Sequence, residues 1–85
     1  MQIAPGMIVR SKAGRDQERF YVVLAVEGGY ALIADGKRRR AEQPKRKNPR
    51  HLSPTRTTVA LTEADTNPKL RRLLKPFNEG AGAVR

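Results

Sequence analysis

The chain contains no cysteine and no tryptophan, and aromatic residues make up only 5% of its 85 residues. Without cysteine, neither a disulfide framework nor a cysteine-based zinc site can form, and an intracellular setting is natural. With so few aromatic residues, the core must be built mainly from Val, Leu, Ile and Ala. A chain of this length encloses one core at most, so we expect one small domain without a large active-site cavity.

Long apolar runs are also missing. The longest covers residues 20–26, whereas a membrane-spanning helix needs about 20 apolar residues. We therefore expect a cytoplasmic protein that makes no membrane contact. His51 is the single histidine, and no cluster of carboxylates accompanies it. The sequence thus offers neither a metal site nor a catalytic dyad. We expect a protein that is not an enzyme and has no cofactor, with His51 packed at the core edge or hydrogen-bonded.

Acidic residues are scarce compared with basic ones: 8 Asp and Glu stand against 18 Lys and Arg, a net charge of +10. Such a domain attracts polyanions, of which nucleic acid is the commonest in a cell and an anionic membrane is the competitor. Residues 1–36 are balanced, with four basic and four acidic residues, whereas residues 37–50 carry eight basic residues and one acidic residue. The composition therefore indicates a scaffold followed by a basic binding segment.

Alternating and apolar runs predict β-strands over residues 7–12, 20–26 and 30–34. The turns between and after them contain Gly14, then Gly28 with Gly29, then Asp35 with Gly36, and each glycine can adopt a positive φ angle. Residues 20–26 are apolar on both faces, as the central strand of a closed barrel requires. We expect Tyr21 and Tyr30 to lie in the core and not to stack on bases.

The next segment predicts two further strands. Residues 37–40 would continue as an exposed edge strand, and residues 50–53 would form a fifth strand that Pro54 ends. Pro44 and Pro49 exclude a helix through this segment. Short strands joined by glycine turns favour a mainly β fold, a small five-stranded barrel of the SH3-like type.

The character of the chain changes after Thr55. Residues 57–62 read as an extended link, and Thr66 and Asn67 before Pro68 predict the start of a helix over residues 68–75. Its apolar stripe would pack on the barrel or on a partner and contains Leu70, Leu73, Leu74 and Phe77. We predict a barrel over residues 1–56, a linker with a short C-terminal helix over residues 57–77, and a flexible tail over residues 78–85.

The stretch GMIVRSKAGRDQERFYVVLAV, which begins at Gly6, resembles the KOW motif of RNA-binding domains. The similarity continues through residue 56 with a DGxxR turn and a PKxKxxxHLxPT element, and the chain most resembles small KOW-domain proteins related to large-subunit ribosomal proteins. The resemblance implies a five-stranded SH3-like barrel and RNA binding, often on the ribosome. It identifies Gly14 as the characteristic glycine of the motif, with Ser11, Lys12, Arg15 and Asp16 around it.

Together these features predict an RNA-binding, ribosome-associated protein that contacts the phosphates of structured RNA through its basic loop. Gly14 is the structural turn residue, and Lys and Arg side chains supply the phosphate contacts. The predicted contacts are Lys12, Arg15, Lys37, Arg38, Arg39, Arg40, Lys45, Arg46, Lys47 and Arg50. The expected partner is ribosomal RNA, with contacts to ribosomal or translation-factor proteins, and the free chain is expected to be a monomer.

Two alternatives stay open. The protein could be an interaction module that docks on a transcription or translation factor through the barrel edge and the leucine stripe. That hypothesis predicts salt-insensitive binding that depends on Leu70 and Leu74. Duplex DNA is the second alternative, but the sequence offers no recognition helix suited to a major groove.

Overall fold

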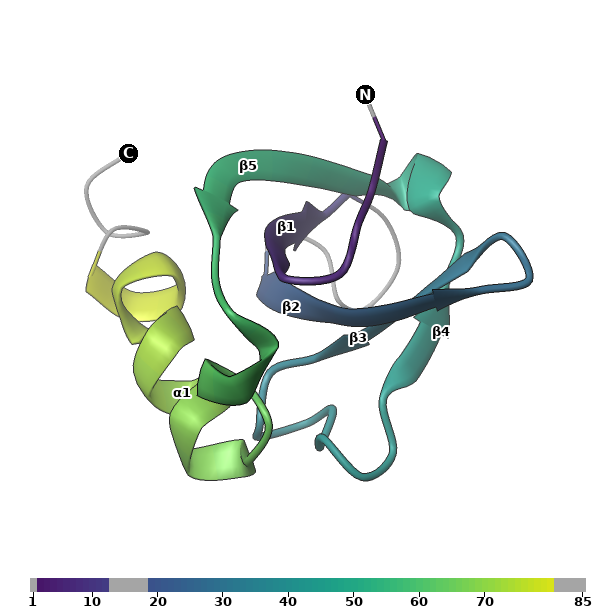
Figure 1. Cartoon of the computed structure of the whole chain (residues 1–85). Helices are drawn as coiled ribbons and strands as arrows, with labels where there is room; N and C mark the ends of the chain where they lie inside the picture. Colours follow the sequence, from purple (N-terminus) through teal and green to yellow (C-terminus); the bar gives the residue numbers. More distant parts are fainter. Residues whose placement is uncertain (1, 13–18, 81–85) are drawn as a thin grey trace.

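Five β-strands form one antiparallel sheet in the computed structural model, which describes residues 2–12 and 19–80 (Figure 1). The strands follow the spatial order β4-β3-β2-β1-β5 and are β1 Met7–Ser11, β2 Phe20–Glu27, β3 Tyr30–Ala34, β4 Lys45–Lys47 and β5 Leu52–Thr58. The helical segments are 3₁₀ turns at Pro49–His51 and Leu61–Glu63, helix α1 at Asn67–Lys75, and a π-helical turn at Pro76–Gly80. The predicted mainly β fold with one short C-terminal helix is confirmed.

The β2–β3 hairpin follows directly from local sequence. Glu27 pairs with Tyr30, so Gly28 and Gly29 alone form the turn, with φ angles of +57° and +82°. Hairpins with two turn residues favour such positive φ angles because they match the twist of the strands, and glycine adopts them without steric cost. This turn was correctly predicted.

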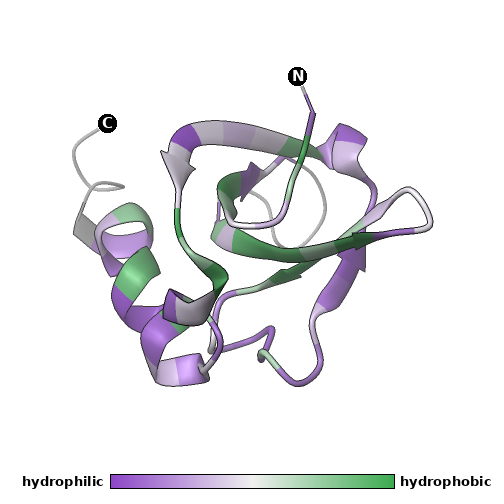
Figure 2. Cartoon of the chain, viewed as in Figure 1, coloured by the Kyte–Doolittle hydropathy of each residue, from purple (hydrophilic) through white to green (hydrophobic). Residues whose placement is uncertain are grey.

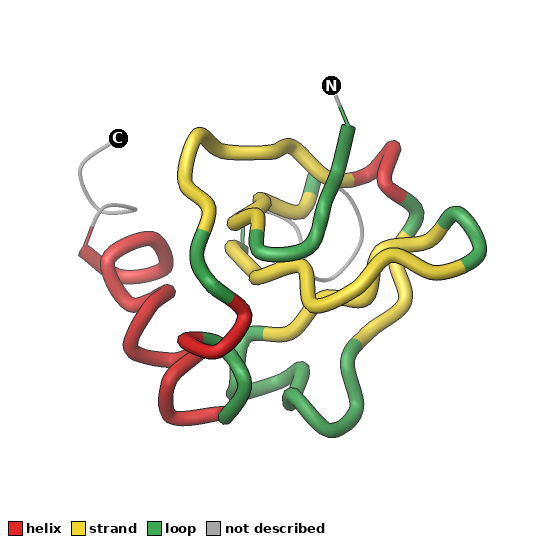
Figure 3. The backbone as a smooth tube through the Cα atoms, in the orientation of Figure 1, coloured by secondary structure: helices red, strands yellow, loops and turns green. Residues whose placement is uncertain are grey.

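The sheet is open, which corrects the expectation of a closed barrel. Across the described residues β4 and β5 are the two edges of the sheet and do not pair with each other. β2 is apolar on both faces because two separate clusters cover it. One face packs Tyr21 and Val23 with residues of β1, β3 and β5, whereas Val22 on the other face packs with Leu70 and Leu74 of α1. Helix α1 therefore covers the sheet face that carries Val22, and the opposite face carries Tyr21 and Val23 (Figures 1 and 3).

Helix α1 belongs to the same core as the sheet. Thr66 caps its start, with the Thr66 hydroxyl accepting the Lys69 amide at 3.4 Å, and Leu70 and Leu74 are 0% and 1% exposed. The interpretation of the leucine stripe as core packing is therefore confirmed. Within the part of the chain that the structure describes, no helix is long and apolar enough to cross a bilayer.

The predicted domain boundaries do not match this arrangement. Residue 56 lies inside β5, and the core that contains Leu70 and Leu74 also contains Ile8 of β1. Residue 78, the expected start of a flexible tail, is also part of the fold. The Asn78 side chain accepts the Phe20 amide at 2.8 Å and donates to the Phe20 carbonyl at 3.3 Å. Sheet and helix therefore form one unit.

One predicted strand is wrong, and the fifth strand has other bounds than predicted: it begins at Leu52 and not at residue 50. Residues 37–40 form a turn and not an edge strand, because the Asp35 side chain holds the amides of Lys37 and Arg39 that a strand would offer to its neighbour. The fourth strand is β4 instead. Pro54 does not end the fifth strand, which runs to Thr58. β5 is an edge strand, where proline is tolerated, and its pairing with β1 shifts register between Met7 and Val9.

Candidate functional site

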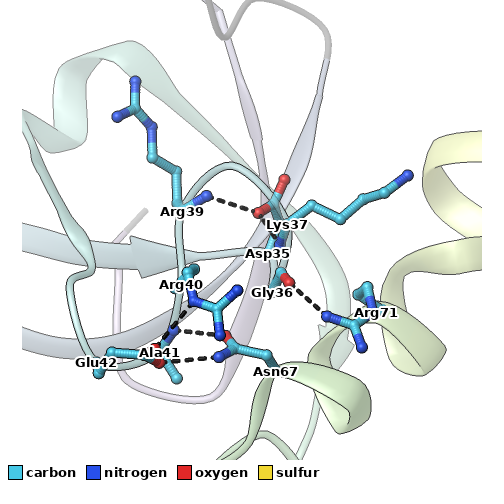
Figure 4. Close-up of polar contacts among 9 residues, drawn as sticks. All are labelled: Asp35, Gly36, Lys37, Arg39, Arg40, Ala41, Glu42, Asn67 and Arg71. Carbon is cyan, nitrogen blue, oxygen red and sulfur yellow. Dashed lines mark hydrogen bonds and ion pairs between the residues drawn. The ribbon is translucent and has the colours of Figure 1, made fainter.

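The basic loop is the connection between β3 and β4, residues 35–44. Its conformation depends on Asp35, a carboxylate directly after β3 with 2% of its surface exposed. Its Oδ1 atom accepts the backbone amides of Lys37 and Arg39, both at 2.9 Å. The Arg39 carbonyl accepts the amides of Asp35 and Gly36 at 2.8 and 3.0 Å, which closes the turn. Figure 4 shows the Asp35 side chain beside the Arg39 backbone nitrogen, to which it is hydrogen-bonded. A charged acceptor makes stronger hydrogen bonds than a neutral one, so Asp35 stabilises this turn.

A second set of contacts fixes this loop against α1. Gly36 has a φ angle of +81°, and its carbonyl accepts a hydrogen bond from Arg71 Nη1 at 2.7 Å. Asn67 Oδ1 accepts the Ala41 amide at 2.7 Å, and Asn67 Nδ2 donates to Glu42 Oε1 at 2.8 Å (Figure 4). The loop is thus attached to the start and to the middle of the helix.

Glu42 is the acidic residue of the basic segment, and its carboxylate is hydrogen-bonded to Arg40 and Asn67. Arg40 Nε donates to its Oε2 atom at 2.9 Å, and the two side chains are 56% and 61% exposed. Hydrogen bonds from Arg40 and then from Asn67 lower the pKa of Glu42 to about 2. At neutral pH the negative charge of Glu42 therefore balances the positive charge of Arg40, and the net positive charge of this loop comes from other residues.

Lys37 and Arg38 are the exposed cations at the tip of the loop. Among the described residues neither side chain has a recorded ion pair. Figure 4 shows the Lys37 side chain extending to the side where Arg71 lies, whereas the Arg39 side chain extends away from it. Arg39 is half-buried and already interacts within the molecule. Lys37 and Arg38 are therefore the two loop cations most accessible to an anion.

Lys45, Arg46 and Lys47, the predicted contact residues in β4, do not all point to the same face of the sheet, because side chains alternate along a strand. Lys45 and Lys47 pair with Ile33 and Ala31, whose side chains are in the core, and Lys47 is only 9% exposed. Arg46 lies on the opposite face, with its guanidinium carbon 4.4 Å from the centre of the Tyr30 ring. Lys47 is too buried to contact a phosphate, so the basic run does not form one continuous surface. In Figure 2, β4 is coloured as hydrophilic, whereas β2 and β3 beside it are largely hydrophobic.

Lys12 and Arg50 lie near each other at another place on the molecule. The Lys12 amide donates to the carbonyl of His51 at 2.8 Å, in the 3₁₀ turn that contains Arg50. Both side chains are exposed. Gly14 and Arg15, predicted as turn and contact residue, lie outside the described residues. The structure therefore brings Lys37 and Arg38 together and, separately, Lys12 and Arg50.

The expectations for the aromatic residues and His51 had mixed outcomes. Tyr21 is fully buried, as predicted, but Tyr30 is 38% exposed because it lies next to the hairpin turn under Arg46. His51 is exposed and does not pack at the core edge. Across residues 2–12 and 19–80 no group of three or more His, Asp or Glu residues is arranged to hold a metal ion.

Sequence reasoning did not single out a cleft between the loop and α1. It has a volume of about 470 Å³, and its lining includes Arg19, Lys37, Arg71, Arg72 and Lys75 together with Asp35 and Glu79. The spacing of the three α1 residues, opposite the leucine stripe, indicates an outward basic face of the helix. It does not indicate that the loop lies beside that face, because this depends on contacts between residues distant in sequence.

Comparison with known proteins adds no relative: the chain matches no protein-family profile, and no curated protein sequence is significantly similar to it.

Proposed function

We propose that this protein binds structured RNA through backbone phosphates, with ribosomal RNA as the expected source. The net charge of +10 and the resemblance of residues 6–56 to KOW domains support this proposal. Lysine and arginine favour binding to RNA because they release counterions condensed on the phosphates. No catalytic chemistry or cofactor is part of the proposal, and a cytoplasmic location belongs to it.

One observation carries the proposal: exposed cations lie on a loop that is already ordered. Asp35 accepts the backbone amides of Lys37 and Arg39 at 2.9 Å, and Asn67 accepts that of Ala41 at 2.7 Å. A loop that is ordered before binding loses less conformational entropy when it meets its ligand. A flexible charged segment would lose more conformational entropy when it binds, and its affinity would be lower. The geometry of the loop therefore favours a phosphate-binding role over that of a solvated surface segment.

The accessible part of the predicted set is smaller than the sequence implies. Lys47 is buried and Arg40 is paired with Glu42, so the described residues of the set that best meet phosphates are Lys12, Lys37, Arg38, Arg46 and Arg50. If about four of them contact RNA, the slope of log affinity against log salt should be about −3 to −4. The protein-interaction alternative has less support, because Leu70 and Leu74 are packed in the core.

The test is RNA binding by a variant that carries Lys37→Gln and Arg38→Gln. The control carries Arg56→Gln and Lys69→Gln, which remove the same number of charges from β5 and from α1, outside the loop. We expect the loop variant to bind a labelled RNA hairpin of about 20 nucleotides at least tenfold more weakly at 0.1 M salt. The control should change affinity by no more than about threefold. Equal binding by the loop variant and the control would contradict the proposed surface.

The ribosomal part of the proposal has its own test. A tagged copy of the protein should sediment with ribosomal particles in a gradient at low salt and leave them at high salt. Hairpin binding without sedimentation on particles would limit the proposal to another structured RNA. If the wild-type protein binds neither the hairpin nor the particles, the RNA-binding proposal is wrong.

A further inference from the structure

The cleft between the basic loop and α1 collects cations from three separate parts of the chain. Arg19 comes from the residue before β2, Lys37 from the loop after β3, and Arg71, Arg72 and Lys75 from the helix. Two carboxylates, Asp35 and Glu79, also line it, so the lining carries five basic and two acidic side chains. The cleft is therefore strongly cationic.

The pairing of these groups is uneven. Arg19 lies 3.6 Å from Asp35 Oδ2, and one nitrogen of Arg71 donates to the Gly36 carbonyl. For Lys37, Arg72 and Lys75 no ion pair is recorded with any residue among 2–12 and 19–80. Like charges that converge without partners repel one another, and a cleft focuses their field on an anion. The cleft thus has the electrostatics of an anion site.

Helix α1 by itself explains only part of this arrangement. Cations are favourable in the last turn of a helix because the C-terminal carbonyls carry partial negative charge, and this accounts for Arg72 and Lys75. It does not account for Lys37, which reaches the cleft from the loop. The loop is held there by Asn67 and by the contact between Gly36 and Arg71. The stability of α1 therefore explains the cations on the helix, but it does not explain why the loop places Lys37 beside them.

We propose that this cleft is a second phosphate-binding element, in which Arg72 and Lys75 of α1 contact the RNA backbone next to the phosphates held by Lys37 and Arg38. The proposal rests on the proposed RNA binding and deepens it. Because Lys37 belongs to both the loop and the cleft, one RNA strand can run from the loop onto the helix. Helix α1 then has two faces with separate roles. Leu70 and Leu74 fix it to the sheet, and Arg72 and Lys75 beside Leu74 meet the ligand.

The test compares a cleft variant, Arg72→Gln with Lys75→Gln, with the control variant that carries Arg56→Gln and Lys69→Gln. Lys69 lies on the same helix but does not line the cleft, and it pairs with Asp65 at 3.0 Å. Glutamine is a good helix former, so circular dichroism should show α1 intact in both. Loss of two phosphate contacts should reduce the salt slope by about 1.4–1.8 and weaken hairpin binding about tenfold or more at 0.1 M salt.

The outcomes separate this inference from the function on which it rests. If wild type binds, the loop variant is weakened and the cleft variant matches the control, the cleft proposal is wrong and RNA binding by the loop stands. If wild type does not bind, the proposed function fails and the cleft proposal fails with it. A second measurement is the NMR signal of the Arg72 Nε–H group, which should shift when the RNA hairpin is added. An unchanged Arg72 signal at saturating hairpin would also overturn the cleft proposal.

Discussion

Replacing Gly36 by alanine should destabilise the protein far more than the same change in the hairpin turn. A Cβ atom at residue 36 would collide with the Asn67 carbonyl oxygen and lie 3.0 Å from Leu70 Cβ. Gly28 has a φ angle of +57°, and an added Cβ atom there would meet nothing within 4 Å. The two positions therefore share the cost of a positive φ angle and differ in the space around the new methyl group.

The magnitude follows from these two terms. A positive φ angle costs alanine about 1 kcal/mol, and the smaller entropy of the unfolded alanine chain offsets part of that cost in both variants. The collision at residue 36 must push the loop away from α1, and forced overpacking of this kind costs about 1–3 kcal/mol. Gly36→Ala should thus be about 2 kcal/mol less stable than Gly28→Ala. In a domain of this size that difference lowers the melting temperature by about 10 °C.

Urea unfolding followed by far-ultraviolet circular dichroism measures both free energies of unfolding. The chain has no tryptophan, so backbone ellipticity is a better probe than fluorescence. Two variants with the same midpoint and the same slope would refute the close packing of the loop on α1. A larger loss in Gly36→Ala would support it, and that variant should also bind RNA more weakly, because the cleft depends on the same packing.

Two further changes test the contacts that surround the loop. Asn67→Ala removes the acceptor of the Ala41 amide and the donor to Glu42, so we expect a loss of about 1–3 kcal/mol in urea unfolding, and a loss below about 0.3 kcal/mol would contradict these bonds. The pKa of Glu42 is lowered in the folded state from 4.5 to about 2, so its stabilising effect is present above pH 4.5 and is lost as the pH falls towards 2. The stability difference between wild type and Glu42→Gln should accordingly shrink over that pH range, by a small amount because the pair is exposed, and a constant difference would argue against the Arg40–Glu42 contact.

The sequence was sufficient for the elements whose signals are local. Strands β1 to β3 and the helix follow from apolar spacing, from the glycine pair at residues 28 and 29, and from the cap at Thr66. β2 was recognised as apolar on both faces, but a closed barrel and a covering helix produce the same pattern. Choosing between them requires knowing that Leu70 and Leu74 pack against Val22, which no local pattern states.

The basic loop shows the same limit at the level of the site. Counting charges correctly located the cationic segment, but it could not tell that Asp35 would convert residues 37–40 into a turn. Nor could it tell that β4 would direct Lys47 inward, because strand alternation depends on where the strand begins. The cleft depends on contacts between residues distant in sequence, such as Gly36 with Arg71, which are 35 positions apart. The proposed class of ligand rests on residue types, whereas tertiary contacts determine which of the cations are exposed.

The shared core of sheet and helix has a consequence for how the protein folds during its synthesis. Ile8, Val22 and Ala34 lie on the sheet face that α1 covers, and they emerge from the ribosome well before Leu70 and Leu74. Until the helix has been made, this apolar face has no cover, and exposed apolar surface of this kind favours aggregation in partly folded chains. Docking of α1 therefore does two things at once: it buries the exposed apolar face and it completes the cationic cleft.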